Sequence, residues 1–353
     1  MNGFILSDGS RNFSQADRVW YREGSLPLEL RKNFEGPSAL LVSSLKAGIW
    51  DPVIPLDNPH QRIHLGEGRT PLLKISWGGR SLWVKAEYQN PTGSFKDRGA
   101  AVMISRAREE GASEVLEDSS GNAGCSVAAY AAYGGLNCQI FVPNTASPSK
   151  IRMMERLGAR VIQVPGGRQA ATDAAFRASQ NGWFASHVWC PWFLEGTKIF
   201  AYELWQECGG SLPEEIIFPV GNGTLILGAW MGFSELKEFG LLTRMPALSA
   251  AFSEACAPLL APNGPFGSTR ADGIAVQRPA RREQILDCVN KTGGRLYSVT
   301  ELDLWKAWEK ACKMGFYIEY TCAVALAALA QSPVYGDILV PLTGTGLKNP
   351  ETH

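Results

Sequence analysis

The chain has 353 residues, of which 45% are hydrophobic and 19% charged. That length favours two domains, because a single hydrophobic core stops growing at about 250–300 residues. Since 34 basic residues balance 34 acidic ones, no bulk charge draws the protein to a nucleic acid or an anionic membrane, and neither partner is expected.

The first 70 residues carry weak patterns rich in proline and glycine, which predict an extended N-terminal segment laid on the core. Beyond them, short apolar strands alternate with amphipathic helices, and this alternation predicts parallel sheets covered by helices. The predicted strands are residues 81–88, 113–118, 138–143, 159–165, 214–220, 246–255 and the start of 336–346. The predicted helices are 97–111, one within 119–135, 147–158, 168–182, 197–210, 224–240, 300–315 and 321–331.

Two details refine these elements. Ser147 is predicted to cap the helix at 147–158, with Pro148 at its first position. The segment 258–295 is rich in proline, glycine and arginine and matches no pattern of strand or helix.

The eight cysteines include no C-x-x-C pair, and none precedes Cys125. This distribution is typical of reduced thiols, so we expect a cytoplasmic protein with no disulfide framework and no metal site. The N-terminus lacks the basic segment of a secretory signal, and the longest apolar run, residues 321–330, is about half as long as a membrane helix. No membrane partner is therefore expected.

The stretch NPTGSFKDRG, residues 90–99, places Lys96 at the predicted start of a helix, where the helix dipole disfavours a cation. One interpretation is a solvated lysine that follows a surface turn. The other is an amine that forms an imine with an aldehyde cofactor, because nearby positive charge and partial desolvation favour the neutral amine.

Three more loops are predicted at the carboxyl ends of strands, where open parallel sheets bind ligands. Residues 119–122 either cap a helix or offer hydroxyl and backbone N–H groups to a carboxylate. Gly221 and Gly223 form either a structural turn or a phosphate cradle; Gly228 comes two residues too late for a dinucleotide fingerprint. Thr343 lies either in a polar turn or against a heteroaromatic nitrogen.

Together these loops resemble the threonine synthase-like pyridoxal-phosphate enzymes, which belong to fold type II, the tryptophan synthase β-like family. The resemblance spans residues 64–350 and rests on stretches that follow the family's order: GEGRTPLL, NPTGSFKDRG, SSGNAG, LEGTKIFAYEL, PVGNG, IEYTCAVALAAL and LTGTGLKNP. It implies an α/β fold with two domains, each an open, mostly parallel sheet flanked by helices. It also implies a homodimer, with residues 1–98 and 185–353 as a large cofactor-binding domain and 99–184 as a small mobile domain.

The same resemblance implies a role for each loop, with pyridoxal 5'-phosphate as the cofactor. Lys96 corresponds to the lysine that joins the cofactor aldehyde, Asn122 to the residue hydrogen-bonded to the ring hydroxyl, and Thr343 to the partner of the pyridine nitrogen. The residues implied in binding the cofactor phosphate are Gly221, Asn222, Gly223 and Thr224. Those implied in holding the substrate carboxylate are Ser119, Ser120 and Gly121.

At one position the sequence departs from the family. Threonine synthases usually carry an arginine just before the LEG stretch, where it grips the phosphate of O-phosphohomoserine; here that place is Phe193. A phenyl ring cannot replace hydrogen bonds to a charged group, each worth roughly 1.5–3 kcal/mol. Other candidates for a phosphate counter-charge are Lys150, Arg152 and Lys198.

The implied chemistry is loss or replacement of a β or γ substituent of a small amino acid, with Lys96 as general base and acid. Overall motif similarity favours O-phosphohomoserine as the substrate, giving threonine and phosphate. Phe193 favours a non-phosphorylated amino acid, as in a serine or threonine ammonia-lyase or a β-replacement enzyme. Two other classes stay open: a pyridoxal-phosphate-binding regulatory protein without turnover, and a nicotinamide-dependent oxidoreductase suggested only by GNGTLILG.

Overall fold

The structure is a computed structural model that describes residues 5–7, 12–13, 29–31, 37–179 and 182–348. The chain divides into two compact units, which we describe separately. The first comprises Met1–Glu67 and Lys96–Ile199, and the second comprises Gly68–Phe95 and Phe200–His353. The sequence predicted different domain limits, with residues 1–98 and 185–353 in a large domain and 99–184 in a small mobile one. Those limits concern which parts of the chain move together, so they stay a prediction.

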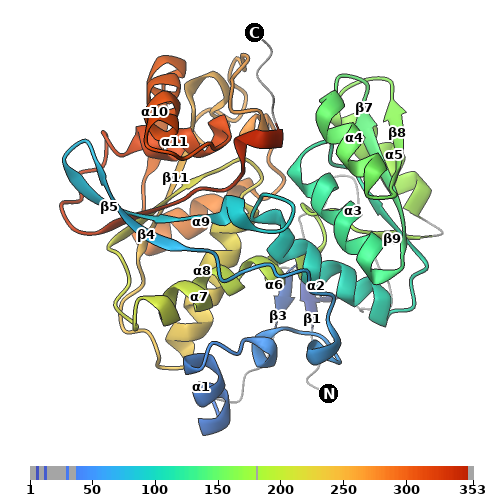
Figure 1. Cartoon of the computed structure of the whole chain (residues 1–353), viewed down its shortest axis with the longest axis horizontal. Helices are drawn as coiled ribbons and strands as arrows, with labels where there is room; N and C mark the ends of the chain where they lie inside the picture. The colour runs from blue at the N-terminus through green and yellow to red at the C-terminus, as the bar shows by residue number, and fades with distance from the viewer. Residues whose placement is uncertain (1–4, 8–11, 14–28, 32–36, 180–181, 349–353) are drawn as a thin grey trace. The chain divides into compact units, whose positions relative to one another are not determined.

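The first unit contains a sheet of order β8-β7-β6-β9 in which every neighbouring pair is parallel (Figure 1). Its strands are β6 (Glu114–Glu117), β7 (Asn137–Pro143), β8 (Arg160–Val164) and β9 (Trp183–Phe184). Its helices are α1 (Ala39–Lys46), α2 (Lys96–Glu109), α3 (Asn122–Gly134), α4 (Pro148–Arg156), α5 (Arg168–Ala178) and α6 (Pro191–Thr197). The short strands β1 (Ile5–Ser7), β2 (Asn12–Phe13) and β3 (Glu29–Arg31) pair antiparallel.

The strand order of this sheet reverses beside β6. The chain steps from β6 to β7 to β8 in one direction and then returns to place β9 on the other side of β6. There Leu116 pairs with Phe184, and the backbone N–H of Ala185 donates to the carbonyl of Leu116 at 2.7 Å. The carboxyl ends of β6 and β9 are therefore adjacent at a topological switch point, the usual ligand-binding position in open α/β sheets.

The second unit is built around a sheet of order β12-β11-β10-β13-β5-β4, parallel except for the pairing of β4 with β5. Its strands are β4 (Leu72–Trp77), β5 (Arg80–Lys85), β10 (Glu215–Pro219), β11 (Ala247–Ser253), β12 (Leu296–Val299) and β13 (Ile338–Pro341). Its helices are α7 (Ile199–Glu207, whose first residue lies in the first unit), α8 (Thr224–Glu238), α9 (Arg282–Thr292), α10 (Glu301–Lys313) and α11 (Tyr320–Ala328). The order also reverses here, because β13 returns to the free side of β10.

Apolar burial holds the second unit together. One buried cluster joins β5 and β13 to α10 and α11, and α11 packs on β10, β11 and β12. Because α11 is apolar on almost every side, it is buried on almost every side. Thr300 begins α10 with its hydroxyl accepting the N–H of Asp303 at 3.0 Å, as expected of an N-cap residue.

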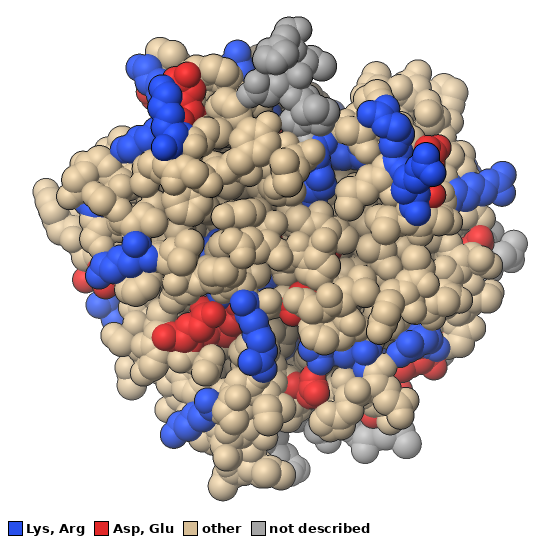
Figure 2. Space-filling view, in the orientation of Figure 1, with Lys and Arg blue, Asp and Glu red and all other residues tan. Residues whose placement is uncertain are grey.

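The surface agrees with the balanced composition. On the face shown in Figure 2, cationic and anionic side chains stand in small groups separated by uncharged residues. No helix in the described part of the chain has the length and apolar character needed to span a membrane.

The predicted α/β class, with two open and mostly parallel sheets flanked by helices, is confirmed. One local expectation was wrong: the supposedly extended first 70 residues include helix α1, although many of them lie outside the described residues. The segment 258–295, for which no element was predicted from the sequence, holds α9. Ser147 is the N-cap residue of α4 and Pro148 its first residue, as predicted. The Ser147 hydroxyl, however, bonds that of Ser149 at 2.8 Å and makes no hydrogen bond to a backbone N–H of the helix.

Candidate active site

Lys96 is the first residue of α2, as the sequence predicted. The residues before it belong to the second unit and are held against the loop that follows β13. There Ser94 bridges to Gly344, and the N–H of Phe95 donates to the carbonyl of Thr343 at 3.1 Å. The chain therefore enters Lys96 from a backbone that is fixed to the Thr343 loop.

Within the first unit, Lys96 lies beside Phe193. The ammonium nitrogen of Lys96 is 5.7 Å from the centre of the Phe193 ring, a cation–π distance. Phe193 is fully buried, and a Cβ placed on Gly99 would come within 2.6 Å of the ring. On the other side, a Cβ on Gly196 would lie 2.0 Å from the carbonyl oxygen of Arg98. Only glycine at both positions allows α2 and α6 to pack so closely.

The loop at residues 119–122 leads from β6 into α3. Ser119 is buried, and its hydroxyl accepts the N–H of Gly121 at 3.3 Å. A Cβ on Gly124 would lie 2.1 Å from the carbonyl oxygen of Ser119, so the loop folds tightly over the first turn of the helix. Asn122 is the first residue of α3. The loop thus lies at the positive end of a helix, which suits a carboxylate ligand.

In the second unit, Gly221 to Thr224 leads from β10 into α8. Gly223 precedes the helix with a φ of +74°, and a Cβ there would lie 2.5 Å from the side chain of Ile285. A Cβ on Gly221 would lie 2.8 Å from the Cα of Ile274. Among the described residues, no backbone carbonyl accepts the N–H groups of Asn222 or Gly223. A helix start with such N–H groups is a ready anion site.

Thr343 follows β13, the strand next to β10 at the switch point of this sheet. It is buried, and its hydroxyl lies 3.5 Å from the sulfur of Cys322. Burial raises the pKa of the Cys322 thiol to about 11, so the neighbour of Thr343 is uncharged at neutral pH. A neutral hydroxyl beside a neutral thiol would leave a pyridine nitrogen unprotonated.

These residues fit pyridoxal phosphate. The glycine turn before α8 suits its phosphate, and Thr343 suits its ring nitrogen. A further observation supports the fit: the hydroxyl of Ser94 is fully buried, yet no hydrogen-bond partner for it is found among the described residues. Buried polar groups are normally paired, so an unsatisfied hydroxyl next to the Thr343 loop is explained by a polar ligand.

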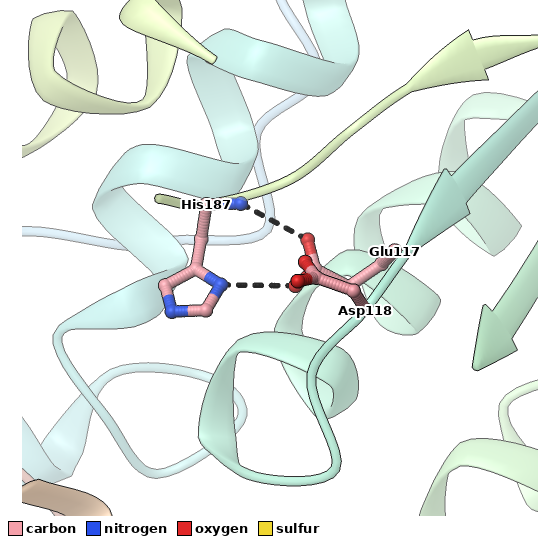
Figure 3. Close-up of side chains that lie close together, drawn as sticks. All are labelled: Glu117, Asp118 and His187. Atoms are coloured by element: carbon pink, nitrogen blue, oxygen red, sulfur yellow. Dashed lines mark hydrogen bonds and ion pairs between the residues drawn. The ribbon is translucent and has the colours of Figure 1, made fainter. Parts of the chain in front are cut away.

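The sequence did not single out a cluster of Glu117, Asp118 and His187 at the switch point of the first unit (Figure 3). The Nδ1 atom of His187 is 2.9 Å from Glu117, and the backbone N–H of His187 donates to the same carboxylate at 3.1 Å. Asp118 accepts the hydroxyls of Ser186 at 2.8 Å and Thr172 at 2.6 Å. All three residues of the cluster are buried.

Burial and the neighbouring charge of Asp118 raise the pKa of Glu117 well above its ordinary value, although Arg168, the His187 N–H and Lys96 oppose the shift. Ligand atoms of the three residues lie within 4.8 Å of one another, close enough for a metal ion. Both carboxylates, however, already accept hydrogen bonds, which favours a proton-sharing network over a metal centre. The signal in the sequence was two acids at the end of one strand and a histidine just after another.

The alternative phosphate-binding cations differ in exposure, because Arg152 on α4 is exposed whereas Lys150 and Lys198 are buried. Lys198 is fully buried, and its ammonium forms a 2.7 Å ion pair with Glu195. Lys150 is buried in α4. The positive charge of Lys198 is therefore matched by a carboxylate, which reduces its attraction for a phosphate.

Glycine-rich helix starts and buried polar side chains at the carboxyl ends of parallel strands are typical of α/β enzymes that bind phosphorylated cofactors. Residues 63–344 match the family described as pyridoxal-phosphate dependent enzyme, and the chain belongs to that family. It is 31% identical over 329 residues to a threonine synthase of Methanocaldococcus jannaschii, an alignment that covers 86% of this chain and 81% of that protein. The predicted cofactor and the predicted class, a threonine synthase-like pyridoxal-phosphate lyase, are confirmed.

Solved structures show the same fold. A fungal L-serine ammonia-lyase from Rhizomucor miehei superposes with a TM-score of 0.68 at 20% identity, covering 81% of this chain and 95% of that chain. A serine racemase from Dictyostelium discoideum superposes with a TM-score of 0.69 at 23% identity, covering 81% and 95%. The different activities in their names show that the fold alone does not fix the reaction.

Proposed function

We propose that this chain catalyses the elimination or replacement of a β or γ substituent of a small amino acid. The observation that carries the proposal is the position of Lys96: it begins α2 directly after a backbone bonded to the Thr343 loop, and its amine lies beside the buried Phe193 ring. An amine at the positive end of a helix is favoured in the neutral form that a general base needs.

Each predicted residue has one task in this proposal. Backbone N–H groups of Gly221, Asn222, Gly223 and Thr224 hold the cofactor phosphate, while Asn122 bonds the ring hydroxyl and Thr343 faces the ring nitrogen. Ser119, Ser120 and Gly121 hold the substrate carboxylate. Bound pyridoxal phosphate supplies the electron sink that makes the Cα proton of the substrate acidic. Lys96 removes that proton and returns it, a role worth roughly 10²–10⁴-fold in rate.

Two substrate classes remain, and different observations favour them. Similarity to threonine synthases supports O-phosphohomoserine, with water replacing phosphate to give threonine. The buried Phe193 ring supports a non-phosphorylated amino acid, because it offers no donor to a phosphate where the family carries an arginine. The negative charge of the buried Asp118 also disfavours a phosphate dianion in the first unit.

The test uses the full chain loaded with pyridoxal phosphate. O-phosphohomoserine, serine, threonine and O-acetylserine are offered in turn, and phosphate, ammonia, keto acid and product amino acid are all measured. Borohydride reduction followed by peptide mass spectrometry is expected to find the cofactor on Lys96. Lys96→Ala is expected to abolish turnover and the adduct without unfolding the protein, whereas Lys74→Ala, at an exposed strand position, serves as the matched control. Full activity of Lys96→Ala would rule the mechanism out.

The resemblance also supports a homodimer in the cytoplasm as part of this proposal. The eight cysteines are free thiols in the structure, as a reducing compartment allows. Light scattering on the purified, cofactor-loaded protein measures the mass directly, and a mass of one chain, 38.4 kDa, would contradict the dimer.

A further inference from the structure

The proposed mechanism assigns no task to Glu117, Asp118 and His187, although they are buried at the switch point between β6 and β9. Glu117 binds His187 twice, through the ring Nδ1 at 2.9 Å and through the backbone N–H at 3.1 Å. This double contact fixes both the backbone and the ring of His187. A carboxylate that holds one ring nitrogen is the usual device for orienting an acid–base histidine.

The other ring nitrogen is then the one that exchanges a proton. Because Nδ1 faces Glu117, Nε2 lies on the side of the ring turned away from both carboxylates (Figure 3). With Nδ1 bonded to the Glu117 carboxyl, Nε2 is the ring nitrogen that carries a proton toward a substrate. The charged and titratable groups around the pair are Asp118 just after β6, Arg168 at the start of α5, Lys96 at the start of α2 and Cys138 on β7.

His187 and Lys96 flank the same aromatic ring. The rings of His187 and Phe193 meet edge to face with centroids 5.8 Å apart, and the Lys96 ammonium is 5.7 Å from the centroid of Phe193. Because the base and a second proton carrier both contact the Phe193 ring, the second carrier is suited to a substrate atom a few bonds away from Cα. The substituent that departs is such an atom.

We propose that His187 is the proton donor to the departing substituent, that Glu117 is its positioning residue, and that the substrate carries a free hydroxyl on Cβ. This inference rests on the proposed function. Lys96 takes the Cα proton, and the electron pair of that C–H bond becomes the new Cα–Cβ double bond. The Cβ–O bond breaks with its electron pair on oxygen, Nε2–H gives its proton to that oxygen, and water leaves. Solvent water then reprotonates the imidazole.

The need for a donor identifies the substituent. Hydroxide leaves carbon poorly unless it is protonated, whereas phosphate and chloride leave as stable anions. A built proton donor is therefore useful for a hydroxy amino acid and superfluous for a phosphorylated one. The negative charge of Asp118 repels a phosphate dianion and leaves a neutral hydroxyl unaffected.

The experiment compares two leaving groups on one enzyme. His187→Gln, in the full chain loaded with pyridoxal phosphate, is offered serine and threonine on one side and β-chloroalanine on the other. We expect kcat for the hydroxy amino acids to fall roughly 10²–10⁴-fold, while kcat for β-chloroalanine stays within about tenfold of wild type. Glu117→Gln is expected to lose less on the hydroxy substrates, because an amide oxygen still accepts the Nδ1 proton.

Cofactor absorbance and thermal unfolding are measured for each variant, and if His187→Gln fails to load, Glu117→Gln carries the same comparison. Equal losses on both kinds of substrate would show a structural role and overturn the inference. A wild type that converts β-chloroalanine or O-phosphohomoserine but no hydroxy amino acid would also overturn it, and would leave the proposed function standing. A loaded wild type inert toward every amino acid would instead refute the proposed function.

Discussion

Replacing Gly223 with alanine tests the phosphate cradle. Gly223 precedes α8 with a φ of +74°, a conformation that costs an L-residue roughly 1–2 kcal/mol. The added Cβ would also lie 2.5 Å from the side chain of Ile285, and overpacking of this kind costs about 1–3 kcal/mol. Together these effects predict that Gly223→Ala lowers the free energy of unfolding by roughly 2–5 kcal/mol.

Gly240 supplies a matched control at the other end of the same helix. Its φ is +68°, and a Cβ there would meet nothing within 4 Å. Gly240→Ala should therefore cost only the backbone term, roughly 1–2 kcal/mol. The double variant Gly223→Ala/Ile285→Ala should lose about 1–3 kcal/mol less stability than the sum of the losses in its two single variants. The reason is that the Ile285 side chain, which the added Cβ would contact, has been removed. Urea unfolding of the cofactor-free protein measures all four variants.

The affinity for pyridoxal phosphate shows whether residues 221–224 bind the cofactor phosphate or only form a tight turn. If N–H groups before α8 bind the phosphate, displacing one charged hydrogen bond costs about 1.5–3 kcal/mol, or roughly 10- to 150-fold in the Kd for pyridoxal phosphate. Gly240→Ala should leave that Kd unchanged. Equal Kd values for the two variants, measured by absorbance titration, would refute the assignment of the phosphate to Gly221–Thr224.

Two further predictions concern single side chains. Phe193→Arg should raise activity toward O-phosphohomoserine, because each hydrogen bond to the phosphate is worth roughly 1.5–3 kcal/mol. It should also lower the stability of the protein, because the packing of the ring on Gly99 is lost. Unchanged activity would show that the phosphate is bound elsewhere. Burial raises the pKa of Glu67, but bonds from His64 at 2.6 Å and Tyr130 at 2.8 Å outweigh it and hold that pKa below its ordinary 4.5. The Glu67 carboxylate therefore stabilises the fold above that value and loses its contribution as pH falls through the lowered pKa. Glu67→Gln should lower the free energy of unfolding by about 1–3 kcal/mol at neutral pH. Measured by urea unfolding at a series of pH values, the stability of the variant should fall less steeply at acid pH than that of the wild type. Parallel plots of stability against pH for the two proteins would contradict this.

Local patterns were enough to predict most of the fold. Short apolar strands followed by helices with glycine stops predicted β6 to β8 with α2 to α5, because each element is set by its own periodicity. The antiparallel strand β4 was missed despite a local signal. Gly78 and Gly79, with φ of +60° and +83°, form the two-residue turn that joins it to β5, and a Gly-Gly pair between alternating runs indicates such a hairpin.

The buried site was only partly predictable, for a physical reason. Lys96, Asn122 and Gly223 lie at the starts of helices, so their setting follows from adjacent sequence. Glu117 and His187 meet only because β9 pairs beside β6, and that pairing joins residues about seventy positions apart. No local pattern encodes a contact of that range, although Glu117 ends a strand that the sequence predicted.

The enclosure of a second lysine bears on chemical selectivity. Lys85, at the end of β5, is fully buried, and its ammonium contacts Glu203 at 2.5 Å, Glu207 at 2.9 Å and the carbonyl of Thr70. A lysine amine attacks an aldehyde only if the aldehyde can reach it, and here burial and three hydrogen-bond acceptors enclose the amine. Lys85 is thus barred from competing for reactive carbonyl compounds, and even a large excess of aldehyde in the cell would be expected to leave it unmodified.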